Sequence, residues 1–162
     1  MSENALFKTA LNKAMALCSQ REYCIRDIQE KLGSWGVSTA DNEKIIDLLK
    51  KENFINEERF AAAFVKDKFN YNKWGKIKIS SHLRAKQIPG STIKSALDSI
   101  DHEVYTRVIN DLITSHRRSV KAKNQYDLKA KLLRYGLSKG FESSILYDIL
   151  NSQLKDSEGD PD

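Results

Sequence analysis

The sequence predicts an all-α fold made of three tandem three-helix repeats, which form an elongated, curved array. The first reason is chain punctuation, because only two prolines, Pro89 and Pro161, occur among the 162 residues. Six of the seven glycines fall where helical periodicity stops, as is typical of helical proteins. Helical periodicity and internal repetition are the other two reasons.

Apolar residues recur at the spacing i, i+3, i+4, i+7 and i+8 in one long stretch, which predicts a helix with one buried face. The residues of this stretch are Tyr105, Val108, Ile109, Leu112 and Ile113. A shorter stretch of the same kind contains Ile93, Ala96, Leu97 and Ile100. No stretch alternates comparably with a period of two, so we do not expect strands.

An internal repeat of about 50 residues contains these helices. In each copy a helix with a leucine near its end leads into a short turn, a branched or aromatic anchor and a second apolar helix. The leucines are Leu32, Leu83 and Leu132, and the anchors are Val37, Ile88 and Phe141. The third register is the loosest, because Gly136 also interrupts it. Another helical stretch precedes each copy, which predicts three-helix repeats at 5–54, 55–100 and 101–154.

Capping residues agree with these helices. Ser38, followed three residues later by Asp41, resembles a capping box. Asn56 can cap the helix that opens with two glutamates, whose charge favours a helix N-terminus. The last segment, 155–162, is acidic and lacks apolar side chains, so we expect a disordered tail there.

The chain should act in the cytoplasm and away from membranes. No apolar run approaches the roughly 18 residues of a membrane span, and the N-terminus lacks a signal-peptide core. Cys18 and Cys24 are the only cysteines, and they have no metal-binding partners at ligand spacing. We expect both thiols to be reduced, with Cys18 in the core.

Positive charge is concentrated in the middle of the chain. Residues 1–65 carry 9 basic and 10 acidic side chains, residues 66–134 carry 16 and 6, and residues 135–162 carry 2 and 6. Such a segment suits a polyanion, above all nucleic acid, whose binding releases counterions. The alternative is a solvated surface that only keeps the protein soluble.

Within 66–78, lysines alternate with Phe69, Tyr71 and Trp74, a mixture that can contact phosphates and stack on unpaired bases. The alternative is that Phe69 and Trp74 are core residues at a helix junction, and we favour a structural role for Trp74. A second basic cluster spans 117–123, and its lack of apolar periodicity predicts an exposed loop. The candidate residues for binding nucleic acid or a filament are Lys73, Lys76, Lys78, Arg84, Lys86, Arg117, Arg118, Lys121, Lys123, Lys129, Lys131 and Arg134.

Motifs for catalysis are missing from the sequence. His82, His102 and His116 are too far apart to form a local metal or acid–base pair, and no phosphate-binding loop or nucleophile elbow occurs. We therefore expect a non-enzymatic protein without cofactor or metal. An enzyme whose site is assembled from dispersed residues is the alternative.

One segment carries a family resemblance. Residues 54–64, FINEERFAAAF, resemble the signature of the RecX family: an apolar pair, Asn or Asp, an acid, Arg, an aromatic, Ala and a second aromatic. Further matches to the family's three repeats are Ala14, Leu17, Arg21 and Leu32; Gly75, Lys76, Ile79, Leu83, Lys86 and Ile88; and Lys131, Leu132, Gly140, Phe141 and Glu142. The sequence departs from the family pattern at Cys24, Gln87 and Lys139, where Ser, Gly and Arg are usual.

The resemblance implies a monomeric regulator of the recombinase RecA in DNA recombination, repair and the SOS response. Such a protein lies in the groove of the RecA filament on single-stranded DNA. There it modulates, and mainly inhibits, the ATPase, strand exchange and coprotease activities of RecA. Binding to single-stranded DNA, and to duplex DNA as a further candidate, is also implied. A stand-alone helical DNA-binding module is the alternative that needs no RecA.

Overall fold

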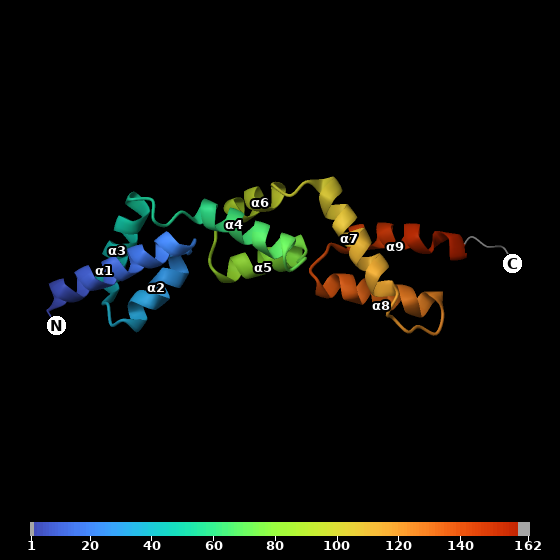
Figure 1. The fold of residues 1–162 in the computed structure, drawn as a ribbon, viewed down its shortest axis with the longest axis horizontal. Helices are drawn as coiled ribbons and strands as arrows, with labels where there is room; N and C mark the ends of the chain where they lie inside the picture. Colours follow the sequence, from blue (N-terminus) through green and yellow to red (C-terminus); the bar gives the residue numbers. More distant parts are fainter. Residues whose placement is uncertain (1, 159–162) are drawn as a thin grey trace. The chain divides into compact units, whose positions relative to one another are not determined.

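The computed structural model describes residues 2–158, and within them the chain forms nine α-helices and no strand (Figure 1). The all-α prediction is confirmed. The helices are α1 (Glu3–Gln20), α2 (Ile25–Ser34), α3 (Thr39–Lys51), α4 (Glu57–Asn70), α5 (Lys76–Ala85), α6 (Gly90–Asp98), α7 (His102–Arg117), α8 (Gln125–Ser138) and α9 (Ser143–Glu158).

Both predicted caps are present. The Ser38 hydroxyl accepts the backbone N–H of Asp41 at 3.2 Å at the start of α3. The Asn56 side-chain oxygen accepts the N–H of Arg59 at 2.9 Å at the start of α4. Each bond satisfies a backbone donor that has no partner inside its helix.

The chain divides into two compact units, of which unit 1 comprises Met1–Val65 and Leu83–Ala96. Helices α1, α2 and α3 pack against one another in this unit (Figure 1). Their shared core is apolar and consists of Ala10, Ala14, Tyr23, Ile28, Leu32, Val37, Ile45, Ile46, Leu49 and Ile55. Burial of these apolar faces stabilises helices that would be marginal alone.

Unit 2 comprises Lys66–His82 and Leu97–Asp162. Helix α8 packs against α7 and α9, and α7 also contacts α9. The amphipathic stripe predicted for α7 is confirmed, since Tyr105, Ile109 and Ile113 are fully buried. The Tyr105 ring lies 5.7 Å from the Phe69 ring and 5.9 Å from the Phe141 ring, so three aromatic side chains form the centre of this core.

The three predicted anchors are buried, and each follows the same helix-ending turn. The anchor N–H donates to the carbonyl five residues earlier: Val37 to Leu32 at 3.1 Å, Ile88 to Leu83 at 3.1 Å and Phe141 to Gly136 at 3.2 Å. The residue before each anchor is left-handed: Gly36 with φ +85°, Gln87 with φ +63° and Gly140 with φ +91°. These are Schellman turns, in which the six-to-one bond satisfies a carbonyl at the helix end.

The predicted register of the third copy is wrong by one helical turn. Gly136, not Leu132, supplies the carbonyl that corresponds to those of Leu32 and Leu83. A Cβ at Gly136 would lie 2.4 Å from a methyl carbon of Leu146, so Leu146 occupies the space that a side chain at position 136 would need.

Two smaller expectations change. Cys24, rather than Cys18, is the fully buried cysteine, and its sulfur accepts the N–H of Asp27 at 3.4 Å at the start of α2. Helix α9 reaches Glu158, so it enters the segment 155–162 in which we expected a disordered tail. Residues 159–162 of that segment lie outside the described residues. None of the described helices is long and apolar enough to cross a bilayer.

Candidate nucleic-acid interface

Two turns that are distant in sequence cross in unit 2. One joins α4 to α5, and the other joins α8 to α9. The N–H of Gly75 donates to the carbonyl of Lys139 at 2.7 Å, and the N–H of Ile77 donates to the carbonyl of Gly140 at 3.0 Å. We call this contact the turn crossing, and it fixes the backbone around the basic segment at 73–78.

Glycine is required on both sides of the turn crossing. A Cβ on Gly75 would lie 2.2 Å from the carbonyl oxygen of Gly140, which is a backbone atom and cannot move aside easily. A Cβ on Gly140 would lie 2.3 Å from the Cβ of Lys78. The close approach therefore depends on two residues without side chains.

Cations surround Trp74 beside this crossing. The Nζ atoms of Lys78 and Lys68 lie 4.6 and 5.1 Å from the centroid of the Trp74 ring. The His82 ring lies 4.5 Å from the same ring. Trp74 and both lysines are half-buried, so the ring combines a structural role with contact to cations that solvent still reaches.

Lys76 contributes to the core as well as to the surface. Its N–H donates to the Tyr105 hydroxyl at 2.9 Å, and that hydroxyl donates to Glu142 in a short hydrogen bond. The Lys76 ammonium lies 4.9 Å from the Tyr105 ring centroid. Burial, followed by the bond to Glu142, raises the pKa of Tyr105 well above its ordinary range. The neutral hydroxyl thus connects α5, α7 and the start of α9.

Lys139 belongs to this cluster, although the sequence analysis did not include it among the binding residues. Its Nζ donates to the carbonyl of Asn72 at 3.0 Å. Partial burial and then the neighbouring charge of Lys78 lower the pKa of Lys139. No local pattern in the sequence marks Lys139, because backbone bonds between two distant turns bring it to the segment 73–78.

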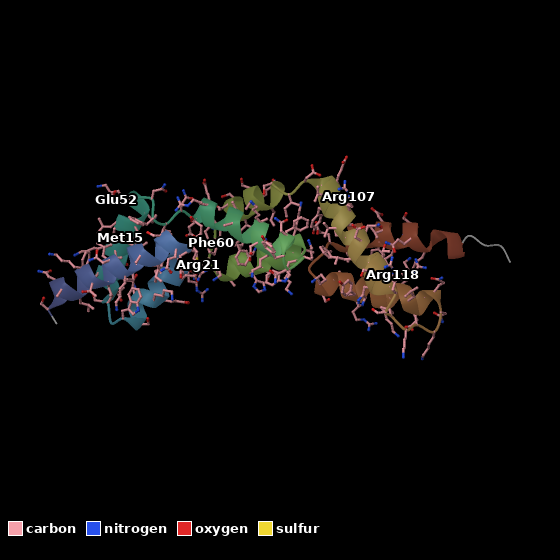
Figure 2. The ribbon with its side chains drawn as sticks, viewed as in Figure 1. Met15, Arg21, Glu52, Phe60, Arg107 and Arg118 are labelled. Atoms are coloured by element: carbon pink, nitrogen blue, oxygen red, sulfur yellow. The ribbon has the colours of Figure 1, made fainter. Side chains whose placement is uncertain are left out.

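The second predicted cluster follows α7. Arg117 is the last residue of α7 and Arg118, which Figure 2 labels, is its C-cap. Lys121 and Lys123 are exposed in the loop that follows. Arg134, on α8, is also exposed. The structure therefore leaves Arg118, Lys121, Lys123 and Arg134 accessible to a polyanion, whereas Arg117 is half-buried.

Other members of this cluster have local partners. The Lys131 ammonium lies 3.1 Å from Asp127 and donates to the carbonyl of Lys121 at 2.7 Å. The backbone N–H of Lys123, first, and Lys131, second, lower the pKa of Asp127. The Lys129 ammonium donates to the side chain of Asn151 at 2.6 Å. Lys129 and Lys131 thus help to hold the loop and α9.

Arg84 and Lys86 belong to unit 1, whereas the other ten candidates belong to unit 2. Arg84 is exposed. The Lys86 ammonium lies 2.9 Å from Asp27 and 6.0 Å from the Phe60 ring centroid. Lys86 lines a pocket of about 490 Å³ together with Arg21 and Phe60. Figure 2 labels Arg21 and Phe60. Lys86 therefore already has an acidic partner.

The histidines take part in ring contacts or lie on the surface. His116 stacks on Tyr135 with centroids 3.7 Å apart, His82 contacts Trp74, and His102 is exposed. Among the residues that the structure describes, no group of three His, Cys, Asp or Glu side chains could hold a metal ion.

Comparisons with known proteins agree with this architecture. A family model described as "RecX, second three-helix domain" matches residues 56–97. The chain is 29% identical over 160 residues to "Regulatory protein RecX" of Clostridioides difficile (strain 630), covering 98% of this chain and 74% of that protein. It is 30% identical over 131 residues to the protein of that name from Clostridium botulinum (strain Eklund 17B / Type B), covering 80% and 61%.

Two solved structures have the same fold. A crystal structure of regulatory protein RecX superposes with a TM-score of 0.84 and 24% identity, covering 93% of this chain and 73% of that one. RecX from Lactobacillus salivarius superposes with a TM-score of 0.81 and 20% identity, covering 92% and 97%. The sequence signature, the family model over 56–97 and the named relatives are all similar to the RecX family, and the two solved structures share its fold.

Proposed function

We propose that this protein is a regulator that binds the RecA nucleoprotein filament and mainly inhibits its ATPase, strand exchange and coprotease activities. The supporting observation is the similarity, over 98% of this chain, to a relative named a regulatory protein. The protein acts in the cytoplasm as a monomer, by binding and not by catalysis, and needs no cofactor. The ATP hydrolysis that it affects is RecA's own.

The proposed architecture for this task is three three-helix repeats at 5–54, 55–100 and 101–154. The family model for the second three-helix domain, at 56–97, supports the middle boundaries. The basic residues of 66–134 approach DNA phosphates or an acidic RecA surface, and counterion release favours the association. Exposed Arg118, Lys121 and Lys123 are the simplest part of this surface to test.

The test measures ATP hydrolysis by RecA on single-stranded DNA while the protein is added. We expect turnover to fall as the protein approaches the concentration of RecA, and filaments seen by electron microscopy to shorten. Unchanged turnover together with unchanged filament length would exclude the proposed function. Duplex binding that is sequence-specific and independent of RecA would favour the stand-alone DNA-binding module.

The contribution of the basic surface needs a charge-matched comparison. One variant carries Arg118→Gln, Lys121→Gln and Lys123→Gln, and the control carries Lys8→Gln, Lys44→Gln and Lys51→Gln, which are exposed residues of unit 1. Both lose the same charge. We expect the first to weaken inhibition and reduce its salt dependence more than the control does. Equal effects would mean that total charge, not this surface, matters.

A further inference from the structure

Lys78 and Lys139 lie on the two sides of the turn crossing, close enough for the charge of Lys78 to act on Lys139, and neither ammonium has a carboxylate among its described contacts. Lys78 lies against the Trp74 ring at 4.6 Å, and Lys139 donates to the Asn72 carbonyl at 3.0 Å. Both partners are neutral. Two cations held near each other in this way repel, so a bound anion would stabilise their arrangement.

Backbone contacts place Lys78 and Lys139 on facing sides of the turn crossing independently of their charge. The hydrogen bonds of Gly75 to Lys139 and of Ile77 to Gly140 hold the two turns together. Gly140 lies so close to Lys78 that a Cβ on Gly140 would be 2.3 Å from the Cβ of Lys78. Lys73 in the same turn has φ +56°, which L side chains rarely adopt. The surrounding contacts therefore hold the turn in a conformation that its own residues disfavour.

An exposed aromatic ring lies in the same turn. Tyr71, next to Asn72, has 83% of its surface exposed. A water-exposed ring close in the chain to cations without acidic partners matches the chemistry of unpaired nucleotides, which offer a phosphate for the amines and a base face for the ring. An acidic protein surface would satisfy the amines but would give the tyrosine no comparable partner.

We propose that Lys78 and Lys139 hold one phosphodiester group of a single-stranded nucleic acid, and that Tyr71 stacks on an adjacent base. This inference rests on the proposed function for its biological setting. Lys139 is the new member of the site, whereas Lys78 already belongs to the predicted basic segment.

The first experiment measures binding of the full chain to fluorescent oligo(dT) over a range of salt concentrations. Lys78→Gln with Lys139→Gln should weaken binding and make the slope of log affinity against log salt shallower by about 0.7, the value for one neutralised phosphate on a single strand. Lys78→Arg with Lys139→Arg keeps both charges and should keep the slope. Thermal unfolding of each variant checks that the fold is retained.

The ring is tested separately, because stacking and charge have different salt dependence. Tyr71→Ala should weaken oligo(dT) binding by roughly five- to hundredfold and leave the salt slope unchanged, whereas Tyr71→Phe should bind like the original chain. Oligo(dT) should also slow acetylation of Lys78 and Lys139 while leaving that of exposed Lys44 unchanged.

The outcomes separate this site from the proposed function. An unchanged salt slope in the Gln double variant, with inhibition of RecA intact, overturns the site and leaves the function standing. An unchanged slope with inhibition lost assigns the amines to an acidic protein surface and also overturns the nucleic-acid site. A shallower slope in a protein that never affects RecA supports the site and overturns the function.

Discussion

The N–H of Ile88 donates to the carbonyl of Leu83 at 3.1 Å, the same bond that ends the equivalent helices before Val37 and Phe141. The three turns share this bond and a left-handed residue before the anchor. They differ in the residue that takes the left-handed conformation, since two copies use glycine and the middle copy uses Gln87. The repeated turn therefore carries a local cost in one copy only.

Replacing Gln87 with glycine should stabilise the protein. A left-handed residue with a Cβ costs about 1–2 kcal/mol, and glycine loses about 0.5–1 kcal/mol more backbone entropy on folding, so the net gain lies between about 0 and 1.5 kcal/mol. Urea denaturation measures the gain in the free energy of unfolding. Gln87→Ala keeps the strained Cβ and should give no gain, and equal stability of the two variants would contradict the strain argument.

Replacement by alanine should have opposite effects on stability at Gly75, which lies at the turn crossing, and at Gly33, which lies in α2. Gly75→Ala places a Cβ 2.2 Å from the Gly140 oxygen, so we expect a loss of about 3 kcal/mol, at the upper end for overpacking. Gly33 lies within α2 with open space around it, so Gly33→Ala should stabilise by about 0.5–1 kcal/mol. Denaturation of both variants is the measurement, and a Gly75→Ala protein as stable as the original would contradict the close contact.

Much of the fold follows from local rules that are visible in the sequence. The α7 stripe, the Ser38 and Asn56 caps and the buried anchors depend on periodicity and on hydrogen bonds within a few residues. The register of the third copy does not follow from local rules, because glycine can stand at position 136 only where Leu146, from the next helix, fills the space beside it. That compensation is tertiary, so a repeat search based on leucines selected Leu132.

The candidate site also contains some residues that local sequence indicates and others that only the tertiary structure brings in. The local sequence pointed to Lys73, Lys76 and Lys78, because lysines alternate with aromatic residues within 66–78. Lys139 reaches them only through backbone bonds between two turns, which no local pattern encodes. Composition also could not separate exposed cations from those with structural partners, such as Lys86 beside Asp27.

The Tyr105 hydroxyl should contribute to stability through its two hydrogen bonds. Tyr105→Phe leaves the Lys76 N–H and the Glu142 carboxylate without this partner, so we expect a loss of about 1–3 kcal/mol in the free energy of unfolding. Tyr126 is 84% exposed, and Tyr126→Phe should change stability by less than about 0.5 kcal/mol. Chemical denaturation compares the two, and similar small effects would show that water replaces both bonds.

Glu57 should make stability depend on pH in the direction opposite to a paired carboxylate. Burial raises the pKa of Glu57 above 4.5, against the attraction of Lys50, and its Oε2 is buried without a hydrogen-bond partner in the described part of the chain. A raised pKa means that the folded state holds the proton more tightly than the unfolded state does. The contribution of Glu57 to stability is therefore full below the unfolded pKa and falls as pH rises toward the folded pKa.

Glu57→Gln removes this titration while keeping a similar shape. We expect the variant to gain stability relative to the original chain at about pH 7, and the gain to shrink toward about pH 4, where Glu57 is protonated in both states. Urea denaturation at several pH values gives the difference directly. Exposed Glu58→Gln, one residue on in the same helix turn, is the control and should lack this pH-dependent gain. A Glu57→Gln protein that is less stable at neutral pH would mean that attraction to Lys50 and to the α4 N-terminus exceeds the cost of burial.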